Sequence, residues 1–371
     1  MCVWRLMLAE IEPWFAHDYR TARGLFLKAA EQNGLSVQSI VHPLRGPEGD
    51  ELATDAVRIG PHDADKLLVL TSGMHGVELY CGSMCQAALI ADGHFASLPD
   101  GMAVLLVHAI NPWGSAHGRR VNENNVDPCR NFLDFARPLP DNADYPRLHP
   151  HLADADRPGE AGDSARAALS ALRAEWGDAR FNAAQFGGQY VYPDGVFYGG
   201  QSAEWTNRTI SGLLREHGGP ARRVATLDYH SGIGPWGEML GVVVHTGEGL
   251  ARARRWYGDA VLAPNDPDQD DPGYYPVTGH SSDGYEAALP DVEVTAVVLE
   301  FGTYPLDRGS EALGQEHWLN SNNGDCDPAE ARAIKAALAR HFNPDDAAWR
   351  ATVWDKSRHA IWQAIAGLVE D

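Results

Sequence analysis

The chain has 371 residues, of which 44% are hydrophobic and 22% are charged, and this is the composition of a globular protein. Its formal net charge of −21 at pH 7 argues against nucleic acid and anionic membranes as partners, because both attract basic surfaces. The sequence has no run of 18 apolar residues, so no membrane-spanning helix is expected.

Predicted helices and strands alternate along the sequence. Residues 1–15 are expected to form a loose extension, and residues 19–32 then place apolar side chains on one helical face before Asn33-Gly34 ends the helix. Further helices are predicted over residues 78–91, 165–176, 203–217, 250–260, 328–341 and 357–369. Strands are predicted over residues 37–41, 67–71, 104–107, 224–229, 242–244 and 295–301.

This alternation predicts an α/β fold, with a mixed, mostly parallel twisted sheet flanked by helices. Residues 137–162 and 264–284 are rich in Pro and Asp and are predicted to be long loops, which are often functional inside a compact domain. No linker is recognisable, so residues 1–371 are interpreted as a single domain.

The five cysteines are odd in number and contain no C-x-x-C pair. The N-terminal residues also lack the apolar core and cleavage site of a signal peptide. Both features favour a reduced, cytoplasmic protein without a disulfide framework.

Polar side chains follow four of the predicted strands at the point where each strand ends. In open α/β sheets, ligands bind outside the carboxyl ends of the strands, so these clusters are candidates for one site. The clusters are His75 with Glu78, the segment 111–114, His230, and Glu300.

A catalytic zinc site needs three protein ligands and an open position, and His75, Glu78 and His230 satisfy this requirement. Zinc lowers the pKa of bound water to roughly 7, and Glu300 is placed to accept the proton. A structural alternative stays open for the H-x-x-E pair. Glu78 could lie in a first helical turn, favoured by the helix dipole, with His75 as an ordinary turn residue.

Four segments in order carry a resemblance to a known family. They are GMHGVE (73–78), NPWGSAHGRRVNENNVDPCRNF (111–132), LDYHSGIGPWG (227–237) and LEFGT (299–303). With them, the chain from about residue 14 to about 320 resembles the M14 zinc carboxypeptidase superfamily, and most closely its DUF2817 branch. The resemblance implies a zinc carboxypeptidase-like fold and one Zn²⁺ per chain. It makes His75, Glu78 and His230 the ligands and Glu300 the general base.

The resemblance also implies roles for the segment 126–132. Asp127 would hydrogen-bond the first zinc histidine and fix its tautomer. Arg120 would stabilise the oxyanion, with the neighbouring Arg119 as the alternative. Arg130, together with Asn131, would bind a substrate carboxylate, a role that suits the planar fork of a guanidinium.

Two further positions belong to this expected substrate site. The family pattern V-D-x-N-R-N-F has an asparagine where this chain has Cys129, and a thiol is a weak hydrogen-bonding group. The grip on a free α-carboxylate is therefore in question, although Arg130 is retained. Tyr275 is a candidate for the loop tyrosine that closes over the substrate in carboxypeptidases, and an ordinary loop tyrosine is the alternative.

The resemblance thus implies a zinc-dependent hydrolase that cleaves an amide bond in a peptide or small molecule bearing a carboxylate. Two alternatives stay open: a deacylase of N-acyl amino acids or related small amides, and a non-catalytic binding protein with the same fold. The substrate and the oligomeric state are not predicted.

Other motifs are interpreted as structural. Residues 279–284 contain Ser, His and Asp without the G-x-S-x-G spacing of a serine hydrolase. Cys81 and Cys85 are expected to pack as small apolar side chains, and the acidic residues 266–271 lack the pattern of an EF-hand. Trp236 is left open between pocket and core.

Overall fold

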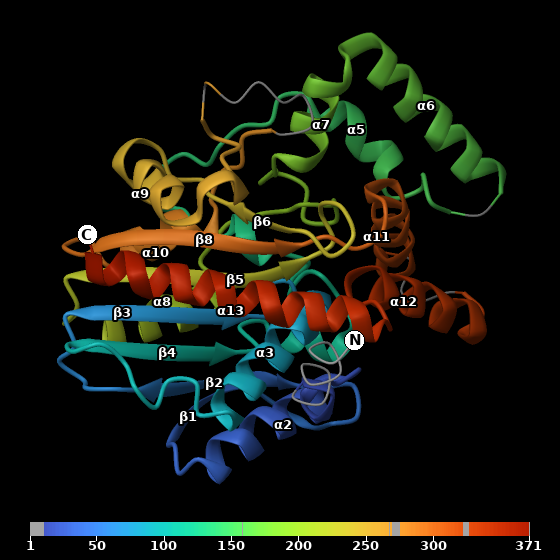
Figure 1. Ribbon diagram of the computed structural model, residues 1–371. Helices are drawn as coiled ribbons and strands as arrows, with labels where there is room; N and C mark the ends of the chain where they lie inside the picture. The colour runs from blue at the N-terminus through green and yellow to red at the C-terminus, as the bar shows by residue number, and fades with distance from the viewer. Residues whose placement is uncertain (1–10, 158, 267, 269–274, 322–325, 371) are drawn as a thin grey trace.

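The computed structural model describes residues 11–157, 159–266, 268, 275–321 and 326–370 (Figure 1). Within these residues, eight strands form one sheet in the order β1-β2-β4-β3-β5-β8-β6-β7. In sequence order the strands are β1 Val37–Arg45, β2 Glu51–Ile59, β3 Lys66–Ser72, β4 Met102–His108, β5 Arg223–Ser231, β6 Met239–Val242, β7 Val261–Leu262 and β8 Glu293–Phe301.

The centre of the sheet is parallel, and its borders are antiparallel. Strands β4, β3, β5 and β8 run parallel to one another, whereas β2 pairs with β4, β1 with β2, and β6 with β8 in antiparallel register. The predicted α/β fold with a mixed, mostly parallel sheet is therefore confirmed. The four central strands carry their carboxyl ends to the same edge, where the predicted polar clusters lie.

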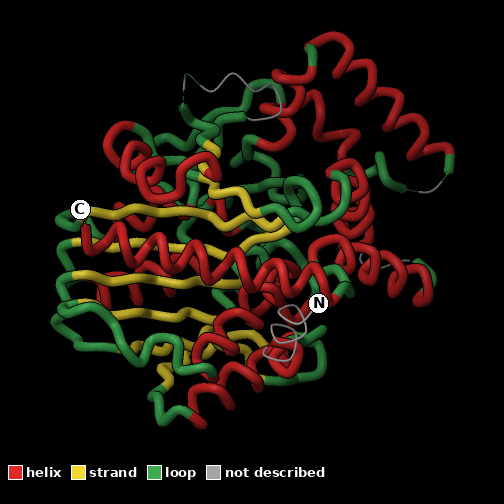
Figure 2. Tube along the Cα trace, in the orientation of Figure 1, coloured by secondary structure: helices red, strands yellow, loops and turns green. Residues whose placement is uncertain are grey.

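Helices cover both faces of the sheet (Figures 1 and 2). One face carries α2 (Tyr19–Gln32), α3 (Leu79–Ala91), α9 (Gly247–Tyr257) and α13 (Ala347–Glu370). The other face carries α8 (Trp205–Gly218) and α10 (Ser281–Ala288). The remaining α-helices are α4 (Pro112–His117), α5 (Tyr145–Leu152), α6 (Glu160–Trp176), α7 (Asp178–Phe186), α11 (Leu306–Ser321) and α12 (Pro328–Phe342).

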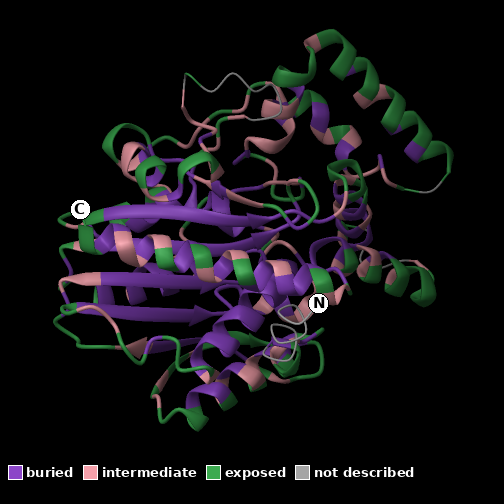
Figure 3. Ribbon diagram, in the orientation of Figure 1, coloured by how far each residue is buried: buried purple, intermediate pink, exposed green. Residues whose placement is uncertain are grey.

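The central strands are buried on both faces, as their continuous apolar sequences predict (Figure 3). Alternate residues of β3 enter different cores: Leu68 and Leu70 pack toward α3 and α13, and Leu67 and Val69 pack toward α8 and α10. Tyr229 of β5 faces the α13 side, where its hydroxyl hydrogen-bonds Ser357. The next residue, His230, therefore faces the opposite side.

Several sequence predictions differ from the structure. β2 was not predicted, because Thr54 and Asp55 interrupt its apolar pattern, although both are buried. The predicted loop 137–162 contains α5, whose Pro150 and histidines obscure its helical pattern. In the predicted loop 264–284, residues 267 and 269–274 lie outside the described residues, and the end of the loop begins α10.

The predicted N-terminal extension, residues 1–15, lies mostly outside the described residues. Within its described part, Ile11 is fully buried in the core beside α3 and α13. Glu12 accepts hydrogen bonds from the guanidinium of Arg350 in α13, at 2.9 Å from Nε. Residues 11–12 therefore pack against the domain.

Over the described residues, no helix is both long enough and apolar enough to cross a lipid bilayer. The buried cysteines Cys81, Cys85 and Cys129 form no disulfide.

Gly82 sets the distance between α3 and the sheet. A Cβ atom at this position would lie 2.5 Å from Cβ of Tyr229 and 2.7 Å from Cβ of Ser72. We expect Gly82→Ala to lower the free energy of unfolding by about 1–3 kcal/mol, measured by urea denaturation, because helix and sheet must separate. Gly24→Ala, in an exposed part of α2 with nothing within 4 Å, should instead raise it by about 0.5–1 kcal/mol. If the two substitutions changed the free energy of unfolding equally, the close packing of α3 against the sheet at Gly82 would be contradicted.

Candidate metal centre

The turn after β3 places His75 and Glu78 at the edge of the sheet. His75 precedes a short 3₁₀ turn, Gly76–Glu78, which leads directly into α3. The backbone N–H groups of Gly76 and Val77 donate to the carbonyls of Arg120 and Arg119, at 3.2 and 3.0 Å. A Cβ on Gly76 would lie 2.1 Å from the backbone of Gly114, so only glycine fits this close approach. The turn is thus fixed against the segment that carries the expected arginines.

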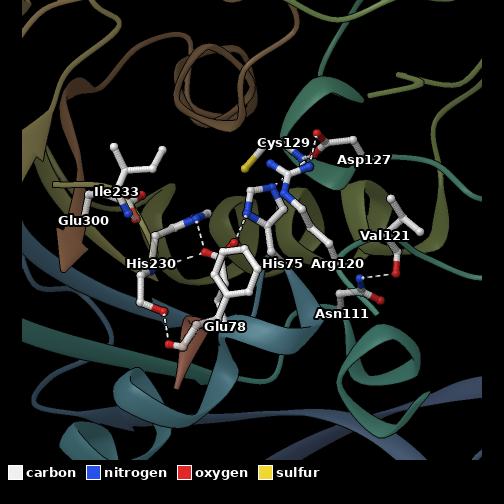
Figure 4. A network of polar contacts seen from close by, with 12 residues as sticks. His75, Glu78, Asn111, Arg120, Val121, Asp127, Cys129, His230, Ile233 and Glu300 are labelled. Atoms are coloured by element: carbon white, nitrogen blue, oxygen red, sulfur yellow. Dashed lines mark hydrogen bonds and ion pairs between the residues drawn. The ribbon is translucent and has the colours of Figure 1, made fainter. Parts of the chain in front are cut away.

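The two histidines point the same ring nitrogen at one carboxylate. Nδ1 of His75 lies 2.9 Å from Oε1 of Glu78, and Nδ1 of His230 lies 3.0 Å from Oε2 of the same residue (Figure 4). All three side chains are buried. The imidazole rings are nearly perpendicular, with centroids 4.8 Å apart. The structure therefore brings together the three ligands predicted from the sequence.

The other nitrogen of each histidine is held by a second carboxylate. Nε2 of His75 lies 3.1 Å from Oδ1 of Asp127, and Nε2 of His230 lies 3.1 Å from Oδ2 of Asp228. Asp228 also accepts a hydrogen bond from Thr71. In a neutral imidazole, these contacts place the proton of each ring on Nε2 and leave the lone pair on Nδ1.

This arrangement fits a metal ion. A lone pair on Nδ1 cannot face an ionised carboxylate at 3 Å unless positive charge lies between them, and a divalent cation supplies it for both histidines at once. Nδ1 of His75 is buried and has no hydrogen-bond partner among the protein atoms. Nitrogen and oxygen donors of this kind are typical of zinc, and the carboxylates behind the histidines are typical of its surroundings.

Without a metal ion, the pKa values of His75 and Glu78 also favour positive charge on the imidazoles beside an ionised carboxylate. Burial lowers the pKa of His75 and so does Arg120, but the charges of Glu78, Cys129 and Asp127 outweigh both and raise it to about 10. Burial opposes ionisation of Glu78, yet its two histidine partners hold the pKa of its carboxyl far below the usual range. Metal binding would therefore displace protons from the imidazoles.

Glu300 lies beside this centre on the neighbouring strand. It is paired in register with His230 across β5 and β8, so both side chains project to the same face of the sheet. Its Oε1 accepts a hydrogen bond from the N–H of Ile233 at 3.0 Å. Burial, and next the negative charge of Glu78, raise the pKa of Glu300 to about 8. A carboxylate with a pKa near neutrality suits proton transfer.

Asp127 joins the metal centre to two arginines. Its carboxylate is fully buried and accepts hydrogen bonds from the guanidinium groups of Arg120 and Arg130, in addition to its contact with His75. Burial alone would raise the pKa of Asp127, but the two arginines hold it well below its usual range. Arg130 also donates to the carbonyl of Phe186, and its Nε has no partner.

Cys129, which the sequence places in the expected substrate site, lies close to the two histidines. Its ligand atom and those of His75 and His230 all lie within 4.8 Å of one another, and these residues form a metal-capable group in the described part of the chain. Burial raises the pKa of the Cys129 thiol, but the charges of the two histidines outweigh it and lower this pKa to about 7. Spacing along the sequence could not show that this thiol faces the histidines.

The other expected substrate residues lie around the same centre. The Asn131 amide donates to the carbonyls of Gly199 and Ser202 and accepts from the N–H of Glu204, so it anchors the segment 199–204. Tyr275 stacks on Phe186 at 5.5 Å, close enough to the two arginines for their charges to affect its pKa. Their roles toward substrate stay predictions.

A sequence profile described as "Protein of unknown function (DUF2817)" matches residues 15–356. The chain belongs to the DUF2817 family. Among solved structures, it is similar to carboxypeptidase A from Helicoverpa armigera, with 14% identity, 90% of this chain and 75% of that chain covered, and a TM-score of 0.48. It is also similar to bovine thrombin-activatable fibrinolysis inhibitor, with 13% identity, 88% of this chain and 97% of that chain covered, and a TM-score of 0.43. A third similar structure is succinylglutamate desuccinylase from Chromobacterium violaceum, with 15% identity, 90% of this chain and 76% of that chain covered, and a TM-score of 0.33. No curated protein matches the chain.

Phe197 is a further residue of this DUF2817 chain that sequence analysis missed. Its ring lies under the guanidinium groups of Arg120 and Arg130, with ring-to-Cζ distances of 5.1 and 4.8 Å. Its φ of 55° is unusual for an aromatic residue, and such conformations cluster at functional sites. The segment 195–200 contains three glycines, but nothing in it marks Phe197 as the residue in this conformation.

A cavity of about 440 Å³ opens beside Phe197 and Arg120. Its walls come from α6, α7 and α11 and include Phe181, Phe186 and Leu313. Because Arg120 lines this mostly apolar cavity, the cavity can receive an apolar or aromatic side chain of a substrate that also carries an anionic group.

The motifs interpreted as structural behave in that way. His280 accepts a hydrogen bond from the N–H of Ser282 and caps α10, and burial lowers its pKa to about 3. Cys81 and Cys85 pack in the core. Trp236 is 44% exposed beside Tyr304 and is not a core residue. Most of the acidic residues 266–271 lie outside the described residues.

Proposed function

We propose that this DUF2817 protein is a zinc-dependent hydrolase that cleaves an amide bond in a substrate bearing a carboxylate. One observation carries the proposal: Nδ1 of His75 and Nδ1 of His230 converge on the two oxygens of Glu78. The opposite nitrogen of each ring is held by a carboxylate. A cation bound between the two nitrogens and the carboxylate would neutralise this buried negative charge, as in known zinc sites.

His75, Glu78 and His230 would hold the ion. When bound, Zn²⁺ would supply Lewis acidity, which lowers the pKa of water to about 7 and polarises a carbonyl. Glu300 then accepts the proton of the attacking water and delivers it to the leaving amine. The hydrogen bond from Ile233 keeps one of its oxygens fixed, so that the carboxylate stays oriented toward the metal centre.

Arg120 and Arg130 would act on the substrate. Arg120 stabilises the negative charge that develops on the carbonyl oxygen, and Arg130 attracts the substrate carboxylate, as preorganised donors do in other hydrolases. Asn131 and Tyr275 would border the same substrate, and the cavity beside Phe197 would receive its side chain. The substrate is a peptide with a free carboxyl end or a small molecule.

A deacylase of N-acyl amino acids is the second candidate. Two features leave this candidate open: Arg130 already donates to Asp127 and to the carbonyl of Phe186, and Cys129 stands in place of the expected asparagine. Both features alter the position where a peptide's terminal carboxylate would be held. Such a substrate still has an amide bond beside a carboxylate, so the roles of Glu300 and Arg120 are the same.

The test begins with metal content. Purified protein, loaded with zinc and dialysed, should hold one Zn²⁺ per chain by elemental analysis, and His75→Ala or His230→Ala should hold far less. His149→Ala is the matched control, since this half-buried histidine pairs with Asp194 away from the centre, and it should keep the full content.

The substrate class is tested on a panel of peptides with free carboxyl ends and of N-acyl amino acids. Hydrolysis of the peptides would identify a carboxypeptidase, and hydrolysis of the N-acyl amino acids would identify a deacylase. If the protein holds stoichiometric zinc but hydrolyses neither group, the proposed activity is wrong and a non-catalytic binding protein becomes the better interpretation. Failure to bind zinc would contradict the metal centre itself.

A further inference from the structure

Cys129 lies opposite Glu78 across the metal centre. Figure 4 shows the sulfur on one side of the two imidazole rings and the Glu78 carboxylate on the other. Sγ lies within 4.8 Å of a ligand nitrogen of each histidine, and the side chain is only 4% exposed. A thiol in this place has two imidazoles in front of it and little access to solvent.

The backbone holds this thiol in position. Cys129 is the second residue of the short 3₁₀ turn Pro128–Arg130, and its N–H donates to Oδ1 of Asp127 at 3.1 Å. The same oxygen of Asp127 lies 3.1 Å from Nε2 of His75. One carboxylate atom therefore fixes both the imidazole and the start of the turn that carries the thiol.

We propose that the Cys129 thiolate is a fourth protein ligand of the metal, alongside His75, Glu78 and His230. This inference rests on the metal centre of the proposed function and changes the role of Cys129 from a substrate contact to a ligand.

The distances fit such a role. With Zn–N bonds of about 2.0–2.1 Å and a Zn–S bond of about 2.3 Å, ligand atoms in a tetrahedral site are roughly 3.3–3.7 Å apart. The ligand atoms of His75, Cys129 and His230 lie at most 4.8 Å apart, so the sulfur needs to approach the two nitrogens by only about 1 Å. Thiolate and imidazole together select zinc over magnesium or calcium.

A fourth protein ligand closes the site. Catalytic zinc sites keep one position open, whereas sites with four protein ligands are closed. The resting centre of this protein is therefore closed by Cys129, and a substrate has to compete with the thiolate for the ion. A chain with asparagine at this position would lack that competition.

Cobalt substitution tests the inference without any activity measurement. Co²⁺ bound by a thiolate gives a sulfur-to-cobalt charge-transfer absorption in the near ultraviolet, which nitrogen and oxygen ligands do not give. The full chain loaded with one Co²⁺ should show this absorption. Cys129→Ser and Cys129→Asn should both bind one Co²⁺ and lose the absorption, with affinity for the metal lowered by about tenfold or more.

Cys81→Ala is the matched control, because this buried thiol lies on the first turn of α3 and contacts the carbonyl of Glu78. It should keep the absorption. One Co²⁺ per chain without the absorption would overturn the role of Cys129 and leave the metal centre intact. An absorption that survives in both Cys129 variants would also overturn it. No bound Co²⁺ at all would overturn the inference and the metal centre together.

Discussion

Replacing Glu300 by glutamine should lower kcat by about 10²–10⁴-fold on whichever amide substrate the wild-type protein hydrolyses. The amide has the shape of the carboxylate and can still accept the hydrogen bond from the N–H of Ile233, so the fold around it is preserved. It cannot take a proton from water or return one to the leaving amine. The measurement is the initial rate at saturating substrate, together with metal content.

The metal content separates a chemical effect from a structural one. Glu300→Gln should still hold one zinc ion, because His75, Glu78 and His230 are unchanged. Glu293→Gln is the matched control, since this residue is exposed at the start of the same strand and pairs with Arg223 at 3.4 Å. Its kcat should equal that of the wild type. A Glu300→Gln variant with wild-type kcat would show that another group is the base.

The sequence predicts the candidate metal residues and Glu300 because each lies at the carboxyl end of a strand or just after it. A continuous apolar run marks the end of β3, and the polar residues after it, His75 and Glu78, have to lie at the edge of the sheet. His230 and Glu300 follow from the same reasoning, and the register of β5 and β8 pairs them directly. Buried parallel strands constrain their ends strongly, so a short motif there has a defined place.

Residues on loops and turns are less predictable for the opposite reason. Cys129 and Phe197 belong to segments without a periodic pattern, and their positions depend on contacts between distant parts of the chain. The N–H of Asp127, for example, donates to the carbonyl of Tyr198 at 2.7 Å. Only the folded structure shows that this contact brings the 126–132 segment and Phe197 to the same centre.

β2 and α5 illustrate a second limit. The Asp55 carboxylate in β2 is buried because Arg23 of α2 pairs with it at 2.7 Å, and a single-sequence pattern cannot anticipate that partner. α5 has a proline inside it and is stabilised by packing of Tyr145 and Leu148 against α6 and α7. In both elements, tertiary contacts outweigh local preference.

Asp127→Asn should have the largest effect on stability of any single change at the centre. The carboxylate is fully buried and faces the guanidinium groups of Arg120 and Arg130. An asparagine would leave two buried positive charges without their counter-ion. We expect the free energy of unfolding to fall by about 3–5 kcal/mol in urea titrations, as in other broken buried ion pairs. Zinc affinity should fall about 10–100-fold, since His75 loses the partner that orients it.

The pH dependence of this loss has a definite sign. The pKa of Asp127 is well below its usual value in the folded protein, so its stabilising effect is present at neutral pH and is lost as the pH falls below the unfolded pKa of about 4. The difference between wild type and Asp127→Asn should therefore shrink in acid. Asp134→Asn removes a carboxylate from an exposed pair with Arg137, and it should change the free energy of unfolding by less than about 1 kcal/mol at any pH. Equal effects of the two substitutions would show that Asp127 does not hold the arginines and His75 together.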